Sequence, residues 1–522
     1  MFLFLRVFFC CLCVLVGAEE VSIRGILLVP NEEILKSTDT TSVEGAVNQD
    51  VILPGNGQKL LDDLDKKYVG QPLTLEELIK IKRAIIRYYR KEHHPAVSVR
   101  IPPQDSSQGV VAFIIVEAKV GAVVYEGNRW VTKDHLEKYI DIHTGDFISE
   151  DILMNNIAWS NRNPFRRTVV VFAPGSIEGT TDLKFISEDR FPVRLFAGAD
   201  NAGTRFTGYD REYGGMTWGN AFGIGDVLHY QYTINSNLNK FQSHYGSYTS
   251  FLPWKNILTV FGKYEKTVEG GKFVQGSVRY IMPIFPLYGP VKREAAIGAD
   301  YKNINTNLFF VEHHPRFAPM VNIFQVYLNY AYEWVWKKNE LELALELYFS
   351  PGEWLANQSK HDYRRLRPHA KNIYTYGQLT LGDVYLLPHK FSVSGNLRLQ
   401  GSFQPLLPCE QFGLGGYNTV RGYREREFNA DEALCANAEL RFPTIRLMKK
   451  KRDELIFLGF IDYGLGYNLQ PSKGYPSSGH LLGIGPGMRY QIDTHFSVRV
   501  DYGVRLLRDS GSMFHAGIEG IF

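Results

Sequence analysis

The stretch FQVYLNYAYEWVWKKNELELALELYF, residues 324–349, decides the fold of most of this chain. Apolar and polar residues alternate with a period of two on both sides of a short WKKN turn. In the first half, Gln325, Asn329 and Glu333 oppose the apolar face; in the second half, Glu342 and Glu346 oppose a row of leucines. The first apolar face comprises Phe324, Val326, Leu328, Tyr330, Tyr332 and Trp334. The pattern predicts two antiparallel strands, each with one polar and one apolar face.

The same alternation begins at Phe191 and continues to FSVRVDYGVRL, residues 496–506, near the end of the chain. A soluble β-sandwich would alternate too. Charge on one face of strand after strand, with aromatic residues near the ends of the other, is typical of an outer-membrane barrel with a polar lumen. About sixteen such segments can be counted, each long enough for the ~9 to 11 residues that a crossing strand needs. The sequence therefore predicts a transmembrane β-barrel of about 16 antiparallel strands over residues 190–522.

The connections between these segments alternate in length. GIGD at 223, PWKN at 253, WKKN at 336 and LPHK at 387 are short, whereas the segments at 303–320, 351–371 and 405–434 are long and polar. In outer-membrane barrels the short turns face the periplasm and the long loops face outside. This orientation places everything before residue 190 in the periplasm.

The start of the chain predicts export. MFLFLRVFFCCLCVLVGAEE carries one early cation, Arg6, then an apolar run and small residues before two glutamates, which predicts a signal peptide over residues 1–18 cleaved after Ala18. The alternative, a membrane anchor, needs an apolar run of ~20 residues. No later run is comparable, so strands must carry any membrane crossing. The net charge of +3 predicts no nucleic-acid partner.

Residues 19–189 contain a repeat. Each copy opens with an apolar strand and continues with helices, of which one begins after Thr74 or Ser149 with acidic residues in its first turn. Two strands joined by a proline-containing turn follow, so the predicted order is β, helix, helix, β, β in both copies. In the first copy, the polar and turn-rich segment at about 30–57 is predicted to be a loop.

Small α+β modules of this kind after a signal peptide resemble POTRA domains, with limits predicted at 19–118 and 119–189. The text NRNPFRRTVVVFAPGSIEGTTDL, residues 161–183, resembles the second POTRA domain of two-partner secretion transporters. That resemblance implies modules that recruit unfolded polypeptides. The alternative is a pair of generic α+β domains without a peptide role.

Two motifs in the barrel region make the resemblance more specific. VRGY lies in the sixth long loop, and FIDYG lies on the second predicted strand after it; both match motifs of the superfamily that joins POTRA domains to a sixteen-stranded barrel. The motif residues are Val420, Arg421, Gly422 and Tyr423, and Phe460, Asp462 and Gly464. The chain thus resembles outer-membrane transporters of two-partner secretion, the haemolysin secretion/activation type. The resemblance implies that a lumenal loop at about 405–434 folds into the barrel, where Arg421 meets Asp462.

An arginine in a lumen partly cut off from water needs a carboxylate, and its planar fork can bind one bidentately. The alternative is a solvated loop arginine with no fixed partner. Phe522, at the end of the last predicted strand, resembles the terminal signature of outer-membrane barrels.

The resemblance implies a transporter that recognises an unfolded exoprotein through periplasmic POTRA domains and passes it through the pore to the cell surface. Its partners would be a large secreted polypeptide, outer-membrane lipid and the general barrel-assembly machinery for its own insertion. A barrel-assembly factor of the same superfamily is the main alternative; a passive porin or a lumenal enzyme would leave the N-terminal repeat without a role.

The sequence predicts no enzyme activity, catalytic residue, cofactor or metal. It contains no P-loop motif and no evident Ser, His and acidic constellation. EHH at 92–94 and EHHP from 312 place adjacent histidines that project apart, which does not favour a metal site.

Five cysteines are present, of which Cys10, Cys11 and Cys13 would leave with the signal peptide. Cys409 and Cys435 bracket the arginine loop and could form one disulfide in an oxidising compartment. Such a clip would restrain the loop that carries Arg421. The alternative is a pair of free thiols, since a bridge needs the two α-carbons within ~7 Å.

Overall fold

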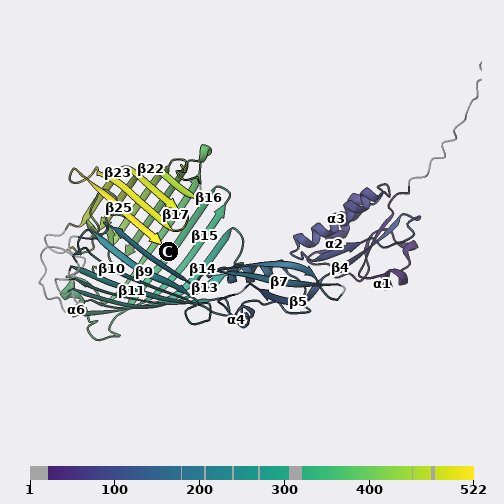
Figure 1. The fold of residues 1–522 in the computed structure, drawn as a ribbon, viewed down its shortest axis with the longest axis horizontal. Coiled ribbons are helices and arrows are strands. Elements are labelled where there is room, and N and C mark those ends of the chain that lie inside the picture. Colours follow the sequence, from purple (N-terminus) through teal and green to yellow (C-terminus); the bar gives the residue numbers. More distant parts are fainter. Residues whose placement is uncertain are drawn as a thin grey trace, which may run out of the picture. The chain divides into compact units, whose positions relative to one another are not determined.

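A computed structural model describes residues 21–522 apart from 128, 178, 205–206, 238–239, 268–270, 305–319, 450 and 472–475 (Figure 1). The predicted signal peptide with its three cysteines and the EHHP segment from 312 lie outside the described residues. The chain packs as two compact units. The first runs up to Val124 and includes Ile142–Leu153 and Val171–Lys184; the second comprises Tyr125–Asp141, Met154–Val170 and Phe185–Phe522.

The first module is a four-stranded sheet in the order β2-β1-β4-β3 with helices on its faces. Its elements are β1 (Gly25–Val29), α1 (Glu32–Ser37), the 3-10 helix η1 (Thr40–Ser42), β2 (Gly45–Asn48), α2 (Gly57–Tyr68), α3 (Leu75–Lys91), β3 (Val97–Arg100) and β4 (Val110–Glu117). Helix α3 begins where predicted, because the Thr74 side chain accepts a hydrogen bond from the backbone N–H of Glu77. It buries Ile81, Ile85 and Tyr89 against the sheet.

The prediction of a loop at 30–57 is wrong, because the segment contains α1, η1 and β2. Strand β1 is buried along its whole length, so both of its faces need apolar cover. Ile26 and Leu28 pack in the core under α2 and α3, whereas Leu27 and Val29 face the opposite side. Ile34 and Leu35 of α1 cover that second face, and β2 pairs in parallel with β1. Residues 30–57 form a helix and a strand because β1 has two apolar faces, and α2 and α3 cover only one of them.

The second module follows the predicted order of one strand, two helices and two strands. Its elements are β5 (Lys119–Glu126), α4 (Lys133–Glu137), α5 (Glu150–Ser160), β6 (Arg166–Pro174) and β7 (Thr180–Asp189), with the sheet order β5-β7-β6. Strand β6 therefore lies at an edge of this sheet. The domain limits at 118/119 and 189/190 stay predictions.

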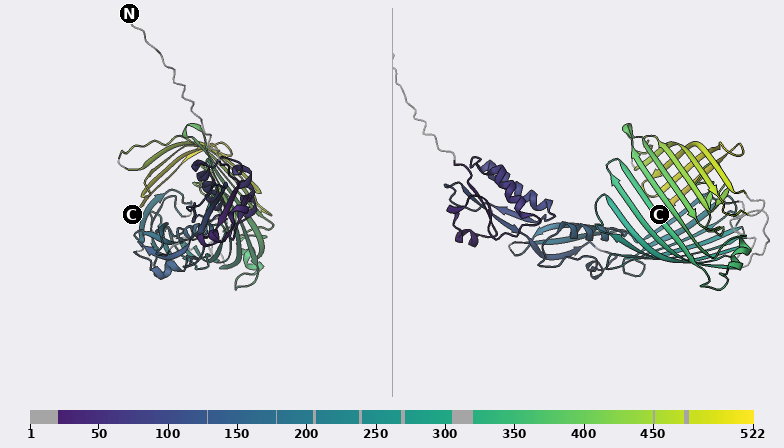
Figure 2. Two further views of the ribbon diagram at one scale, coloured as in Figure 1. Left: turned by 90° about the vertical axis from the view of Figure 1, so that its right-hand side faces the viewer. Right: turned by 180° about the vertical axis from the view of Figure 1, so that it is seen from behind.

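The remainder of the chain forms a closed antiparallel barrel of sixteen strands, so the predicted fold class is confirmed (Figures 1 and 2). The strands are β8 (Val193–Asp200), β9 (Arg211–Gly219), β10 (Val227–Ile234), β11 (Phe241–Phe251), β12 (Ile257–Thr267), β13 (Lys272–Ile284), β14 (Val291–Ile304), β15 (Val321–Trp336), β16 (Asn339–Pro351), β17 (Ile373–Leu386), β18 (Ser392–Ser402), β21 (Glu432–Arg441), β22 (Asp453–Tyr467), β23 (Ser478–Ile492), β24 (Phe496–Arg505) and β25 (Gly511–Ile521). The connections hold α6 (Lys360–Leu366), the 3-10 helix η2 (Pro388–Lys390) and the short strands β19 (Phe412–Leu414) and β20 (Phe428–Ala430).

The two faces of the strands differ as the alternation predicts. On β15 the outward residues Leu328 and Tyr330 are exposed, and on β16 Leu345 and Leu347 are exposed, whereas the inward Gln325 is fully buried. The barrel closes where β25 pairs with β8, and the backbone of Phe522 continues this pairing by exchanging hydrogen bonds with Leu195. Closure removes the sheet edges, which a bilayer does not tolerate. Among the described residues, no helix has the length and apolar character needed to cross a membrane.

Within the second unit, the short turns of the barrel contact residues of the second module. The Tyr139 hydroxyl donates to the carbonyl oxygen of Phe251 at 2.8 Å, and the ammonium of Lys255 donates to Asn156 Oδ1 at 2.7 Å. Lys255 is buried in a left-handed backbone conformation at the tip of the PWKN turn and also pairs with Asp141. These turns are therefore packed surfaces rather than free connections.

Candidate functional site

The connection between β18 and β21 folds back as a hairpin, which we call the arginine loop (residues 403–431). Strands β19 and β20 pair with each other and form its stem. Its apolar side chains Leu414, Val420, Tyr423 and Phe428 are buried together with wall residues such as Leu481. The loop thus packs as a small core on the inner face of the barrel, which brings VRGY to the wall.

Arg421 is 3% exposed and binds Asp462 of β22 through three hydrogen bonds. The guanidinium donates from Nε to Oδ2 at 2.7 Å and from one terminal nitrogen to Oδ1 at 2.8 Å; the backbone N–H adds a third contact at 3.0 Å. Phe460, two residues before Asp462 on the same strand, lies under the guanidinium at 3.6 Å from its ring centroid. The structure therefore brings both motifs together in the bidentate geometry that suits arginine.

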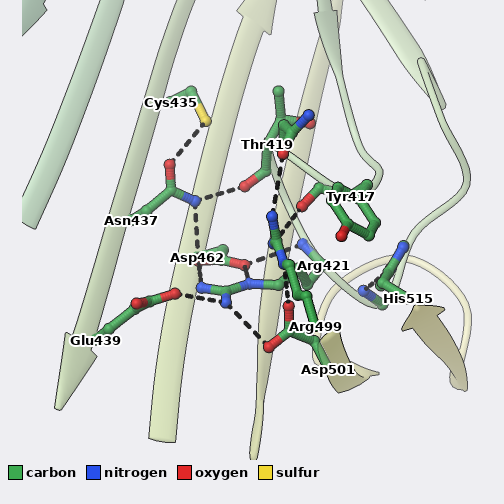
Figure 3. A network of polar contacts seen from close by, with 12 residues as sticks. Tyr417, Thr419, Arg421, Cys435, Asn437, Glu439, Asp462, Arg499, Asp501 and His515 are labelled. Atoms are coloured by element: carbon green, nitrogen blue, oxygen red, sulfur yellow. Dashed lines mark hydrogen bonds and ion pairs between the residues drawn. The ribbon is translucent and has the colours of Figure 1, made fainter. Parts of the chain in front are cut away.

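Two further carboxylates surround the same guanidinium (Figure 3). Its other terminal nitrogen lies 2.7 Å from Glu439 of β21 and 3.5 Å from Asp501 of β24. Asp501, like Asp462, is fully buried, and Arg489 and Arg499 each bind it at 2.8 Å. Three acids and several arginines thus form one connected network, in which each buried charge has an opposite charge as a neighbour.

Glycines give the tip of the loop its close approach to the wall. Gly422 has a φ of +93°, and a Cβ there would lie 2.9 Å from the carbonyl carbon of Gly503. A Cβ on Gly464, the last residue of FIDYG, would lie 2.8 Å from Val420, and one on Gly483 would lie 2.0 Å from the Arg421 carbonyl oxygen. The glycine in each motif is needed because the other segment occupies the space of its side chain.

Contacts on either side of Arg421 hold the rest of the motif. The Tyr423 hydroxyl donates to the Leu507 carbonyl oxygen at 2.6 Å, and Arg505 donates to the carbonyl oxygen of Gly422 at 2.6 Å. The Gly422 N–H donates to Nε2 of His515 at 3.0 Å, which requires that this ring nitrogen carry no proton. The loop tip is therefore bound to β22, β24 and β25.

The far end of the arginine loop is held by a second buried pair. Asp431, whose side chain is fully buried, accepts a hydrogen bond at 2.8 Å from Arg367, which follows helix α6 in the connection between β16 and β17. The backbone N–H groups of Leu406 and Leu469 also donate to Asp431, at 3.0 and 2.8 Å. Helix α6 packs in the core cluster that contains Leu406. The connection that carries α6 is therefore linked to the arginine loop by the Arg367–Asp431 pair and by this shared cluster.

The near end has a third pair. Glu410 accepts hydrogen bonds from Lys302 of β14 and from the hydroxyl of Tyr376 of β17, both at 2.6 Å. Its side chain is fully buried, and that of Lys302 is 11% exposed. The arginine loop is consequently fixed to the barrel by separate ionic contacts near its start, at its tip and at its end.

Cys409 and Cys435 are free thiols in the structure, so the predicted clip is not formed. Cys409 packs with the cluster around α6 and contacts Glu410, whereas Cys435 points from β21 into the cluster under Val420 and contacts Asn437. The two ends of the loop belong to different clusters, and ion pairs occupy the places where a disulfide would act.

A polar cavity of about 320 Å³ adjoins the arginine loop inside the barrel. Its lining residues are Ser394, Asn396, Arg398, Tyr417, Asn418, Thr419, Arg421, Asn437, Glu439, Arg441 and Arg499. Among the described residues, no group of three or more His, Cys, Asp or Glu side chains could hold a metal. In the EHH segment, His94 contacts Glu117 and His93 contacts Asp151, so the two rings have separate partners.

Sequence reasoning found Arg421 and Asp462 but missed Glu439, Asp501 and the Arg367–Asp431 pair. One signal was available: the tripeptide DYG occurs twice, at 462–464 and 501–503. Both aspartates are buried in the Arg421 network, and both glycines touch the loop tip. No comparable pattern marks Arg367, because its partner lies 64 residues away on another loop.

Comparison with known proteins places this architecture in a family. Residues 322–490, which include both motifs and the whole arginine loop, match the family described as haemolysin secretion/activation protein ShlB/FhaC/HecB. Over these residues the chain is similar to this family. The predicted resemblance is thus confirmed, and with it the class of protein: an outer-membrane β-barrel transporter with N-terminal POTRA domains, and no enzyme.

Relatives match far beyond the family segment. The heme/hemopexin transporter protein HuxB of Haemophilus influenzae is 20% identical over 477 residues, 86% of this chain and 81% of that protein. The outer membrane transporter CdiB of Dickeya dadantii is 20% identical over 435 residues, 79% of this chain and 74% of that protein. The solved structure of CdiB from Escherichia coli superposes with a TM-score of 0.72 at 16% identity, covering 97% of this chain and 92% of that one.

Replacing Arg421 by alanine tests the central pair. Arg421→Ala leaves Asp462 buried without its cation, and breaking such a pair costs about 3–5 kcal/mol. The free energy of unfolding of the refolded full chain in urea should fall by this amount. The matched control is Arg424→Ala, three residues along the same loop, whose exposed side chain should cost no more than about 0.5 kcal/mol. Equal losses in the two variants would contradict the assignment.

Gly422→Ala tests the close approach. A Cβ at a positive φ and against Gly503 should cost about 1–3 kcal/mol. The control is Gly395→Ala on β18, where a Cβ would meet nothing within 4 Å. The free energies of unfolding of the two variants in urea are compared. If the Gly422 variant is as stable as the Gly395 variant, the loop tip has space for a Cβ and the close approach is refuted.

Arg367→Met tests the link between α6 and the arginine loop. The variant keeps the length of the side chain but leaves Asp431 with only neutral donors, so the loop end should loosen. Limited proteolysis of the folded chain should cut near residues 403–431 at least several-fold faster than in the wild type. Arg365→Met, an exposed position on α6 itself, serves as the control. Unchanged cleavage in Arg367→Met would exclude the link.

Proposed function

We propose that this transporter captures an unfolded exoprotein at its two POTRA modules and passes it through the barrel when the arginine loop leaves its place on the wall. The observation that carries the proposal is the loop itself, which occupies lumenal space and is fixed at three places by buried ion pairs and hydrogen bonds, beside the small apolar core that it forms with the wall. Each of its three attachments consists of groups that can be rehydrated when they separate. A permanently closed barrel would have no need of so many charges inside.

The buried network suits a loop that moves and returns. Glu439 and Asp501 already contact the Arg421 guanidinium beside Asp462, so the cation keeps a carboxylate partner when its bonds to Asp462 break. Partner exchange lowers the cost of movement, because a stranded buried charge is what makes breaking such a pair expensive. Tyr417, Thr419 and Arg499 line the cavity next to Arg421, which is the space into which a passing chain would first enter.

Capture of the cargo is proposed to occur by strand addition in the second module. Edge strand β6 carries three exposed apolar residues, Val169, Val171 and Phe172, each 44–45% exposed. A free sheet edge offers main-chain hydrogen bonds to any extended segment, and exposed side chains add selectivity. This mode of binding requires no sequence motif in the cargo and suits a polypeptide that has not yet folded.

The cargo class is a large secreted polypeptide. Support comes from the family name, which contains secretion and activation of haemolysin, and from relatives whose names describe transporters. We further propose that the general barrel-assembly machinery inserts this chain, since its closed barrel has the same need for catalysed insertion as other outer-membrane barrels.

Deletion of residues 20–189 tests the role of the modules. The signal peptide would still export the barrel, which should insert and run as a folded species on a gel, but secretion of the exoprotein should be lost. The assay is the amount of a co-expressed large secreted polypeptide that reaches the medium. Full-chain Arg421→Ala should also stop export while its modules stay intact.

The same cells separate transport from assembly. A transporter lacking its modules leaves the other outer-membrane barrels at their normal level, whereas loss of an assembly factor lowers many of them. Unchanged export by the truncated chain would refute the proposed role of the modules, and a general fall in barrel proteins would favour the assembly function.

A further inference from the structure

Helix α3 of the first module has an exposed face of unusual charge. Its 17 residues include six cations and only two acids, Glu76 and Glu77, so that its net charge is +4. Arg83, Arg87 and Arg90 lie three or four residues apart on the exposed side, opposite the buried Ile81, Ile85 and Tyr89. Lys91, one turn after Arg87, is exposed next to Arg90. We call these four residues the cationic stripe.

The side chains of the cationic stripe form no ion pairs within the described residues, although Glu92 follows Lys91 at the C-cap of the helix. Both acids of the helix bind Lys80, at 2.9 Å from Glu76 and 2.8 Å from Glu77, and they raise the pKa of that lysine. Like charges four residues apart, as at 83 and 87 and at 87 and 91, destabilise a helix. Only Arg90 and Lys91, in the last turn, gain from the helix dipole.

Helix α2 of the same module provides a contrast. It carries three lysines, Lys59, Lys66 and Lys67, interspersed with three aspartates, and its net charge is zero. Lys67 lies 3.9 Å from Asp63 one turn earlier. Charge is therefore balanced on one helix of the module and accumulated on the other, which indicates a ligand of opposite sign for α3.

We infer that the cationic stripe of α3 is a docking surface for an acidic, extended segment of the exoprotein. The inference rests on the proposed function for the class of partner and adds the chemistry by which the first module selects it.

Geometry favours an extended polypeptide. Three to four residues of helix advance ~4.5–6 Å along the axis, and alternate side chains of an extended chain repeat every ~6.6–6.8 Å, within reach of flexible arginines. Three of the four cations are arginines, which bind carboxylates through two parallel hydrogen bonds. Ile79 and Leu75, one and two turns before Arg83, are 38% and 72% exposed and would meet apolar residues of the same segment.

A membrane surface fits less well. Helices that bind at the lipid interface place an apolar face among the acyl chains beside their cations. The apolar face of α3 packs in the core of its own module, where Ile81 and Ile85 are fully buried. Anionic lipid could then meet the cations and the two exposed residues Leu75 and Ile79, which is less apolar contact than the full face that gives such helices their affinity.

A labelled peptide tests the docking surface directly. The probe is a fluorescent 15-residue peptide with glutamate at every second position, added to the full chain in nanodiscs of zwitterionic lipid, and anisotropy is recorded at 50, 150 and 500 mM NaCl. We expect binding that weakens steeply with salt. The variant R83Q/R87Q/R90Q/K91Q should bind at least tenfold more weakly, and K59Q/K66Q/K67Q on α2 should stay within twofold of the wild type.

Several outcomes would overturn the inference: no binding of the acidic peptide, equal binding to the stripe variant, or equal binding of a peptide with glutamine in place of glutamate. Flotation with phosphatidylglycerol vesicles addresses the lipid alternative, and binding of vesicles without binding of peptide would also overturn it. Circular dichroism and the gel mobility of the folded barrel verify that both variants fold. The peptide assay needs no exoprotein, so its failure is distinct from a failure of secretion by the wild type.

Discussion

The buried guanidinium of Arg421 is the constraint on which the interior of this barrel depends. A full charge placed in a closed space between a packed loop and a β-wall is costly unless it has partners, and here it has Asp462, Glu439 and Asp501. Those acids are themselves buried, so they need Arg489 and Arg499 in turn. One cation on a loop therefore requires charged partners at inward positions of four wall strands. These are Glu439 on β21, Asp462 on β22, Arg489 on β23, and Arg499 and Asp501 on β24.

Steric room follows from the same constraint. The guanidinium reaches its partners only if the loop backbone lies against the wall, and this contact leaves no space for side chains at Gly464, Gly483 and Gly503. Gly422 must in addition adopt a positive φ so that the chain can turn between Arg421 and Tyr423. The positions of the buried charges and of the glycines thus have the same cause, which is the close contact between the arginine loop and the barrel wall.

The attachments of the arginine loop reach beyond its tip. Through Asp431 and Arg367 the loop is linked to helix α6, and through Glu410 and Lys302 it is linked to β14. Displacement of the loop for a passing polypeptide would therefore disturb the connection that carries α6 as well. At the opposite end of the chain, the first module separates its charges, with balance on α2 and an excess of cations on α3. Transport in this view begins with long-range attraction at the modules and ends with the exchange of ion pairs in the lumen.

Much of the fold was predictable from the sequence, because its signals are local. A period of two residues specifies strands and their two faces, and counting these strands predicted about sixteen, the number that the closed barrel contains. Thr74 with its acidic first turn located the start of α3, and VRGY with FIDYG, by resemblance to a family, paired Arg421 with Asp462 across 41 residues. The second DYG tripeptide, at 501–503, marks Asp501 as a further partner of Arg421. This interpretation is possible only once the first DYG, which contains Asp462, has been identified as part of the site.

Tertiary structure alone decided the remainder, since the deciding contacts join residues that have no common pattern. The segment at 30–57 forms α1 and β2 because the far face of β1 must be covered by apolar side chains. The polar composition of the segment does not show this requirement. Cys409 and Cys435 bracket one loop in sequence yet belong to different packed clusters, so their proximity along the chain did not produce a disulfide. Arg367 meets Asp431 only because two long loops fold over the same end of the barrel. Local periodicity determined which face each residue occupies, and the closing of the barrel determined which faces meet.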